Sequence, residues 1–437
     1  MTASGPRRDT SVTHPELLKP AGQSLGVSPP RGAEVPRPGM FASLSHRGFR
    51  RYWIGMFLSN VGSWMQTIAQ GWLVLRLSDS PLVLGAIAFA GSVPSLIIAP
   101  LAGVAADRGD RRRILILTHL ALMCGALTLA AATGFGFVSV PLVAAVAVSN
   151  GVANAMTTPS HQSIFMDLVG RRDLMNAIAI NSMQFNLSRI VGPAIAGFTI
   201  ASFGETACFL VNGLSYVAIL VPIALLPKLT ARHARSRGAW LELRAGLRFA
   251  RRDPLLPSLM AVCAALAVFG TPAVTLAPVF ARDLLRVGPE GLGGMLSAVG
   301  VGAVATALVL ASRGDFPGKG RAVVAAAAAF ALSIAGLAFF RRYALSLAAL
   351  AVLGGAMMSS SSLINTLMQT RAPDRMRGRI ISLYVLAWLG LVPVGNLLAG
   401  AVAERYGPAA ALWMGAAGIS VTLGIIQLVR PIPATAS

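Results

Sequence analysis

Charged residues are scarce in this sequence, and acidic residues are scarcer than basic ones. Only 12% of the 437 residues are Asp, Glu, Lys or Arg, and only 16 residues are acidic. Soluble globular domains carry about 25% charged residues. With 55% hydrophobic residues and a mean hydropathy of +0.68, the chain has too little polar surface for a water-soluble fold. The composition therefore predicts an integral membrane protein.

Cysteine is also rare, and no catalytic or metal-binding signature is present. The three cysteines, Cys124, Cys208 and Cys263, lie in apolar runs, and none stands at a metal-ligand spacing from another. The sequence contains no Gly-x-Ser-x-Gly elbow, no His/Cys ligand cluster and no Walker Gly-Lys-Ser/Thr run. We therefore predict no catalytic residue, no metal site and no cofactor. An enzyme and a nucleotide-driven pump are excluded, which leaves secondary transport.

The beginning of the chain lacks the apolar run of a signal peptide. Residues 1–43 are rich in Pro, Gly and Arg. A segment of this composition cannot bury enough apolar surface to fold. We expect residues 1–43 to form a disordered cytoplasmic tail and residues 431–437 to form a C-terminal tail.

Long apolar runs fill most of the remaining chain. A membrane-spanning helix needs about 20 mostly apolar residues. Twelve runs meet this length, so we predict an all-α membrane protein with twelve spans. They are Tyr52–Leu77, Pro81–Ala106, Ile114–Thr133, Pro141–Phe165, Met175–Phe203, Thr206–Leu226, Pro257–Phe280, Leu292–Ala311, Ala322–Phe340, Ala344–Thr370, Ile380–Ala403 and Ala409–Val429.

The net charge of +21 is distributed in short basic clusters between the apolar runs. It is not gathered in one patch or domain, so we predict no nucleic-acid partner. Most of the 37 Lys and Arg fall in the N-terminal tail and in alternate links. The positive-inside rule therefore places both termini in the cytoplasm. The other links hold only Arg76, Arg282, Arg286, Arg341, Arg342 and Arg405.

One long basic link, residues 228–254, divides the chain. It contains the stretch WLELRAGLRFARR, in which leucines and a phenylalanine alternate with arginines. This pattern is typical of an amphipathic helix that lies on the inner membrane surface. The link separates an N-terminal six-helix bundle, residues 44–227, from a C-terminal six-helix bundle, residues 255–430.

The two halves share residues at a near-constant offset, which favours an internal duplication. Duplicated six-span halves are the architecture of one large transporter superfamily. The matched pairs are Gly151 with Gly354, Arg172 with Arg375, Gly192 with Gly395, and Gly197 with Gly400.

The stretch GVAADRGDRRR, Gly103 to Arg113, packs charge between two apolar runs. Its Gly103, Asp107, Arg108 and Arg112 resemble the signature between spans two and three of the major facilitator superfamily, although Asp110 stands where that superfamily usually has Gly. The stretch, together with FRRYWIGMFLSNVGSWMQTIAQGWLVLRLSDSPLVLG before it, resembles the branch that exports enterobactin-type siderophores and macrolides.

The resemblance implies two six-helix bundles that rock about a central site. It also implies a conformational gate, in which Asp107 pairs with a basic residue across the interface between the halves. The alternative is that the charges of this stretch only anchor the topology.

A second motif, NLSRIVGPAIAG, lies in the fifth span. Its Gly192, Pro193 and Gly197 resemble the Gly-Pro motif of superfamily antiporters, although Ser188 and Ala196 replace glycines. The alternative is a packing kink, because small residues let helices approach closely and Pro permits bending.

Arg189, within the same motif, lies near mid-span. A charge at that depth costs about 2.5–3.5 kcal/mol on insertion scales, so Arg189 should face the protein interior. No carboxylate lies mid-span in any predicted helix. A structural role and contact with an anionic substrate both remain open.

Three of the predicted spans carry polar faces that must avoid lipid. The candidate substrate-cavity residues on them are Asn60, Ser63, Thr67, Gln70, Asn150, Asn154, His161 and Asn365. Hydrogen bonding between helices is the alternative role for these faces. Proton coupling through His161 is a candidate role, because imidazole can titrate in a physiological range, but a lone His near a helix end is more often a simple hydrogen-bonding residue.

These features predict a secondary transporter in the bacterial inner membrane. The resemblance implies export of a small amphipathic compound, a drug or a siderophore, against protons or another coupling ion. The partners are then a small-molecule substrate, the coupling ion and the lipid bilayer. Uptake of a small metabolite is the alternative within transport. A scramblase or a receptor is the alternative outside it.

Overall fold

The computed structural model describes residues 41–226 and 239–433. The N-terminal tail up to residue 40, residues 227–238 of the basic link, and residues 434–437 lie outside the described residues. The end of the predicted tail enters a 3-10 turn, η1 (Ala42–Ser45). The backbone amide of Ser43 in this turn donates a hydrogen bond of 2.9 Å to Asn176 Oδ1.

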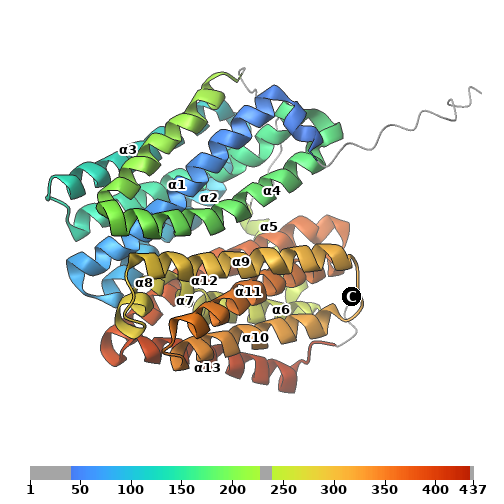
Figure 1. Ribbon diagram of the computed structural model, residues 1–437. Coiled ribbons are helices and arrows are strands. Elements are labelled where there is room, and N and C mark those ends of the chain that lie inside the picture. Colours follow the sequence, from blue (N-terminus) through green and yellow to red (C-terminus); the bar gives the residue numbers. More distant parts are fainter. Residues whose placement is uncertain (1–40, 227–238, 434–437) are drawn as a thin grey trace, which may run out of the picture. The chain divides into compact units, whose positions relative to one another are not determined.

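Every regular element in the described part of the chain is helical (Figure 1). Helices α1 to α4 pack on one another, and α9, α10, α11 and α13 do the same. The long helices are α1 (Arg47–Ser78), α2 (Pro81–Arg108), α3 (Arg111–Gly134), α4 (Val140–Ala224), α5 (Ala239–Arg252), α9 (Pro289–Arg313), α10 (Lys319–Phe339), α11 (Tyr343–Arg371), α12 (Asp374–Tyr406) and α13 (Pro408–Val429). The all-α membrane fold predicted from the sequence is confirmed.

Helix α4 is not one continuous rod. Its backbone leaves helical geometry at Gly170, with φ of 68°, and at Gly204, with φ of 77°. Only glycine adopts this left-handed region freely. The two glycines divide α4 into three segments, residues 140–169, 171–203 and 205–224. Ten helical stretches of the described chain are long and apolar enough to cross a membrane. The count of twelve therefore stays a prediction.

The predicted span Pro257–Phe280 is broken into short pieces. They are α6 (Leu256–Ala265), η2 (Leu266–Gly270), α7 (Pro272–Thr275), α8 (Ala277–Val279) and η3 (Phe280–Leu284). Both η2 and η3 have π-helical geometry. Pro272 and Pro278 remove backbone donors from this stretch, and π turns absorb the mismatch. The stretch Leu256–Thr275 is still long and apolar enough to cross a membrane, so the span here is an irregular helix.

The matched glycines make equivalent contacts within each half. A Cβ on Gly151 would lie 2.1 Å from the Gly91 carbonyl oxygen, so α4 touches α2 there. A Cβ on Gly354 would lie 1.9 Å from the Val299 carbonyl oxygen, so α11 touches α9 there. Helix pairs therefore meet backbone to backbone at corresponding places in the two halves.

A second matched pair joins the halves to each other. A Cβ on Gly197 of α4 would lie 2.8 Å from the Pro289 carbonyl oxygen of α9. A Cβ on Gly400 of α12 would lie 2.8 Å from the Pro81 carbonyl oxygen of α2. These two reciprocal contacts hold the N-terminal half against the C-terminal half at one end of the helices.

The predicted amphipathic stretch of the basic link is helical as α5. It contacts α12, where a Cβ on Gly246 would lie 3.2 Å from the Arg379 Cβ. Its position on the membrane surface stays a prediction.

Candidate functional site

A cavity of about 580 Å³ lies between the two halves. The N-terminal half supplies most of the residues that line the cavity, including most of the polar ones. The polar lining residues of that half are Asn60, Ser63, Gln66, Thr67, Gln70, Ser92, Asn150, Asn154, Asn212 and Tyr216. The C-terminal half contributes Val274, Thr275, Pro278, Leu296, Val392 and Asn396. No Asp, Glu, Lys or Arg is among the described residues that line the cavity.

Helix periodicity brings the predicted polar residues of α1 to the cavity. Asn60, Ser63, Thr67 and Gln70 are spaced three or four residues apart, so one face of α1 carries them all. All four line the cavity, together with Asn150 and Asn154 of α4. The structure thus brings six of the eight predicted cavity residues together. Their contact with substrate stays a prediction.

Two of the predicted cavity residues lie elsewhere. His161 shares a hydrogen bond with the Tyr52 hydroxyl, in the core of the N-terminal half. Asn365 of α11 accepts a hydrogen bond from Gln369, one turn along the same helix. Neither residue is among those that line the cavity.

Besides Ser92 and Thr275, four polar lining residues were not singled out from the sequence. Asn212 donates a hydrogen bond of 2.6 Å to Gln66 Oε1, and this buried pair ties α4 to α1. The Tyr216 hydroxyl lies 3.2 Å from Ser63 Oγ. The fourth is Asn396 of α12. The sequence could have indicated these residues, since each is a polar residue inside an apolar span.

Two amide oxygens at the cavity have no protein donor. They belong to Asn150 of the N-terminal half and Asn396 of the C-terminal half, and both oxygens are buried. A buried acceptor without a donor costs about 1–3 kcal/mol. Asn150 Oδ1 lies against α3, where a Cβ on Gly125 would come within 3.1 Å of it.

The gate motif is described only in part. The side chains of Gly103, Asp107 and Arg108 lie outside the described residues. The Arg112 guanidinium donates to the Ala224 carbonyl oxygen. Asp110, the residue that departs from the superfamily signature, caps α3 by accepting a hydrogen bond of 3.0 Å from the Arg112 amide. This capping role is a local structural reason for an aspartate at position 110.

The Gly-Pro motif lies on the second segment of α4. Gly192 packs on Trp64 of α1, and Gly197 packs on α9. The carbonyl oxygen of Pro193 would lie 2.6 Å from a Cβ on Gly293 of α9. The motif therefore lies where the two halves touch.

Arg189 is partly buried on the same segment of α4. Its Nη2 atom donates to Met357 Sδ of α11 at 3.9 Å. It takes part in none of the ion pairs found among the described residues. The guanidinium therefore faces the other half with only a weak acceptor beside it.

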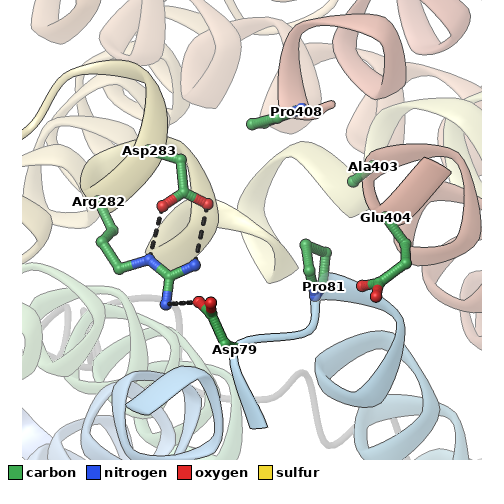
Figure 2. A pocket seen from close by; sticks show the side chains of 7 residues that line it. All are labelled: Asp79, Pro81, Arg282, Asp283, Ala403, Glu404 and Pro408. Atoms are coloured by element: carbon green, nitrogen blue, oxygen red, sulfur yellow. Dashed lines mark hydrogen bonds and ion pairs between the residues drawn. The ribbon is translucent and has the colours of Figure 1, made fainter. Parts of the chain in front are cut away.

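An ion cluster, formed by Asp79, Arg282 and Asp283, lies at the end of the helices where the halves touch. Figure 2 shows the Arg282 guanidinium between the two carboxylates. Its Nη1 lies 2.8 Å from Asp79 Oδ1, and its Nε lies 2.6 Å from Asp283 Oδ1. The Asp283 hydrogen bonds raise the pKa of Arg282 above its usual value. Asp79 follows α1 and Arg282 lies in η3, so the pair joins the two halves.

The ion cluster lines a pocket of about 550 Å³ at this end of the helices. Glu404, near the end of α12, lines the same pocket (Figure 2). Its Oε2 accepts hydrogen bonds of 2.8 Å from Ser80 Oγ and 3.4 Å from the Leu82 amide. A carboxylate at the N-terminus of α2 also suits the helix dipole. Glu404 is thus a second polar link between the halves.

The fold and the cavity between its halves are those of a major facilitator transporter, not of an enzyme. The sequence profile of one branch of that superfamily, described as transmembrane secretion effector, matches residues 38–437. The chain belongs to this family, and it is a multi-pass membrane protein.

Curated relatives of this chain are transporters. The chain is 28% identical over 360 residues to the multidrug efflux pump Tap of Mycolicibacterium fortuitum, covering 80% of this chain and 87% of the pump. It is 24% identical over 359 residues to the staphyloferrin A transporter of Staphylococcus aureus, covering 80% and 88%. It is 23% identical over 384 residues to the enterobactin exporter EntS of Shigella flexneri, covering 88% and 92%.

Solved structures support the fold. The nucleoside transporter NupG superposes with a TM-score of 0.72 at 13% identity, covering 87% of this chain and 98% of that one. A D-xylose-proton symporter superposes with a TM-score of 0.66 at 15% identity, covering 89% and 98%.

Proposed function

We propose that this protein exports a small amphipathic compound, drug-like or siderophore-like, in exchange for protons. The observation that carries the proposal is the cavity between the halves. Amides and hydroxyls form one wall, apolar side chains form much of the other, and no charge lines it among the described residues. Such a cavity suits a guest with both an apolar body and polar groups. The efflux pumps and exporters among the relatives support the direction.

The amides and hydroxyls of the cavity wall narrow the substrate class. Asn60, Gln70 and Asn154 line the cavity with amide groups, and Ser63 and Thr67 line it with hydroxyls. Catechols, hydroxamates and polyhydroxylated drugs carry groups that can hydrogen-bond them. A substrate without such groups leaves this wall unpaired and binds more weakly.

Transport proceeds by alternating access in this proposal. With both termini in the cytoplasm, the ion cluster and Glu404 lie on the outer side and hold that side closed. Asp107 then belongs to the cytoplasmic gate, which holds the inner side closed at the other stage of the cycle. The cavity opens to one side at a time as the two gates exchange.

The direction of transport is tested by accumulation. A bacterial host deleted for its own efflux pumps expresses the protein or an empty vector, and a panel of labelled catecholate, hydroxamate and drug-like compounds is added. We expect expressing cells to retain less of at least one compound, and a protonophore to abolish the difference. Higher retention in expressing cells would establish uptake instead.

The cytoplasmic gate is tested by Asp107→Asn, which removes a charge and keeps the shape. We expect flux to fall about tenfold at equal membrane abundance, because a charge-assisted hydrogen bond of about 1.5–3 kcal/mol is lost from one state of the cycle. Asp374→Asn is the matched control, since Asp374 pairs only with Arg377, one turn away on α12. Unchanged flux in Asp107→Asn would leave the motif a topology anchor.

A further inference from the structure

A cluster of two histidines and two tyrosines lies inside the N-terminal half. We call Tyr52, His119, His161 and Tyr216 the histidine cluster. The rings of His119 and His161 meet edge to face, with centroids 5.3 Å apart. Tyr52 hydrogen-bonds His161, and the Tyr216 ring lies 6.0 Å from the His119 ring. Three helices, α1, α3 and α4, thus contribute to one polar group of side chains.

The surroundings of the cluster are apolar. Its two tyrosines belong to a core whose other residues include Phe49, Leu115, Leu122, Phe165 and Ile219. Among the charged groups of α3 and α4 are Arg111 and Asp167, which pair with each other at 3.9 Å. They lie about two helical turns away along their helices. On α1, the facing titratable group is the Tyr52 hydroxyl itself.

The hydrogen bonds leave each imidazole able to take a proton. His119 Nδ1 lies 2.8 Å from the Leu115 carbonyl oxygen. A carbonyl only accepts, so Nδ1 carries the hydrogen and Nε2 of the neutral ring does not. His161 uses Nδ1 toward Tyr52 and keeps Nε2 for another partner. Two charged rings at this separation would repel each other, so the pair favours one extra proton, not two.

The cluster is one side chain away from the cavity. Tyr216 and Ser63 both line the cavity, and their hydroxyl oxygens lie 3.2 Å apart. The Tyr216 ring also contacts His119. A guest that engages Ser63 or Tyr216 therefore changes the surroundings of the imidazole pair directly.

We propose that His119 and His161 together hold the coupling proton of this transporter. The proposal rests on the proton antiport proposed above and names its site. In the outward-open state, a proton from water adds to one imidazole nitrogen. In the inward-open state, substrate arrival beside Tyr216 favours its release to cytoplasmic water. One proton enters and one proton leaves in each cycle, and no other bond changes.

The pair explains how this chain can use protons without a mid-span carboxylate. The membrane-spanning segments described here hold no acidic residue near their centres. Arg189 stays protonated at any physiological pH, so it cannot load and release a proton. Imidazole is the side chain whose charge changes in the physiological range.

Proton binding is tested directly, with the proton as the probe. The chain has five histidines. Protein labelled with ¹³C and ¹⁵N at histidine is placed in lipid nanodiscs and titrated by NMR from pH 8.5 to 5. His119→Asn and His161→Asn assign the two signals, and Asn keeps a polar group near the Nδ1 position. His46→Asn is the control, because His46 is a half-exposed residue paired with Asp173.

We expect the His119 and His161 signals to titrate as one coupled unit that takes up one proton. In either Asn variant, the remaining imidazole should titrate alone, without coupling to a second ring, whereas His46→Asn leaves the coupled titration unchanged. The proposal is overturned if both rings stay neutral over this range. Independent protonation of both rings would overturn it equally.

A second measurement separates this site from the proposed antiport. Proteoliposomes carry the compound whose retention changes on expression, and two fluxes are recorded: exchange at equal pH, and accumulation driven by a pH gradient. We expect both Asn variants to keep exchange within about twofold and to lose the response to the gradient at least tenfold. If the variants respond to the gradient like wild type, the histidine pair is only a packing element. If wild type itself ignores the gradient, the antiport fails, and the NMR titration still decides whether the pair binds a proton.

Discussion

The two halves of this transporter share their packing framework but not their chemistry. Matched glycines bring α2 against α4 in one half and α9 against α11 in the other. Arg189 lies three residues before Gly192 in the N-terminal half, and the equivalent residue before Gly395 in the C-terminal half is Val392. His161 lies ten residues after Gly151, and the equivalent residue after Gly354 is the fully buried Ile364.

This difference assigns unlike tasks to two structurally similar halves. Backbone contacts at glycine set how the helices approach, so both halves need them for the same motion. Polar side chains inside a membrane are costly and persist where they do work. The N-terminal half supplies most of the polar side chains that line the cavity, and the C-terminal half lines it mostly with apolar ones. We propose that the polar wall recognises the polar groups of the substrate. The broken helix from α6 to η3 supplies part of the C-terminal wall through Val274, Thr275 and Pro278.

The shared framework is broken most severely at Gly197. In Gly197→Val, Cβ would lie 2.8 Å from the Pro289 carbonyl oxygen and 3.0 Å from Gly293 Cα, both in the other half. Overpacking of this kind costs about 1–3 kcal/mol, so this contact between the halves should be lost and flux should fall at least about tenfold. Gly424→Val is the control, because no atom lies within 4 Å of its Cβ position. Flux and Tm of the purified variants are measured together.

If the halves share this framework, Gly400→Val should match Gly197→Val in both readouts. Wild-type flux in either variant would contradict the reciprocal contact between the halves.

Arg189→Lys sharpens the chemical difference between the halves. Arg189 presents a planar, two-pronged set of donors, and Lys keeps the charge without that geometry. Arg189 is not among the residues that line the cavity, so an anionic compound loses affinity on this change only if it reaches Arg189 beyond that lining; its affinity then falls about tenfold or more, since hydrogen bonds to a charged group contribute about 1.5–3 kcal/mol each. A neutral compound and the Tm should change little. Equal losses for both compounds with a lowered Tm would make Arg189 a structural residue.

Much of the membrane fold could be predicted because it rests on local signals. Hydropathy and charge predict the spans, and helix periodicity places Asn60, Ser63 and Thr67 on one face of α1. The links predicted near residues 170 and 204 coincide with glycines of positive φ in α4. The pieces from α6 to η3 were not predicted, because Pro272 and Pro278 indicate a disturbance but not the π turns that accommodate it.

The contacts between distant segments could not be predicted. His161 looked solitary, because its partner His119 lies on another helix and only the packing of α3 on α4 joins them. Asp79 and Arg282 are both link residues, and their pairing depends on how the halves meet. A single sequence carries no record of which helices are neighbours.

We expect the ion cluster to contribute less free energy to the contact between the halves than the glycine contacts do. Arg282→Gln removes its pairs with Asp79 and Asp283 at a site where Arg282 is 31% exposed. Partly exposed pairs contribute about 1 kcal/mol or less, so we expect flux to change about fivefold at low salt and less at high salt. Arg377→Gln is the control, because its pair with Asp374 lies within one helix. A change of equal size in the control would show that the cluster has no special role in closure.

The smallest expected effect compares two threonines on opposite walls of the cavity. Thr67 lies on the polar wall, where its hydroxyl already donates to the Ser63 carbonyl oxygen at 2.9 Å and keeps lone pairs for a guest. Thr275 lies on the wall formed by the C-terminal half.

Substitution by Val keeps the shape of each side chain and removes the hydroxyl. We expect Thr67→Val to weaken substrate affinity roughly two- to fivefold, since one neutral hydrogen bond contributes about 0.5–1 kcal/mol. Thr275→Val should leave affinity unchanged, because that wall contacts the apolar body of the guest. Affinities are measured by equilibrium binding to the purified variants, with Tm as a check on folding. A larger loss in Thr275→Val than in Thr67→Val would reverse the division of labour between the halves and place polar recognition in the C-terminal one.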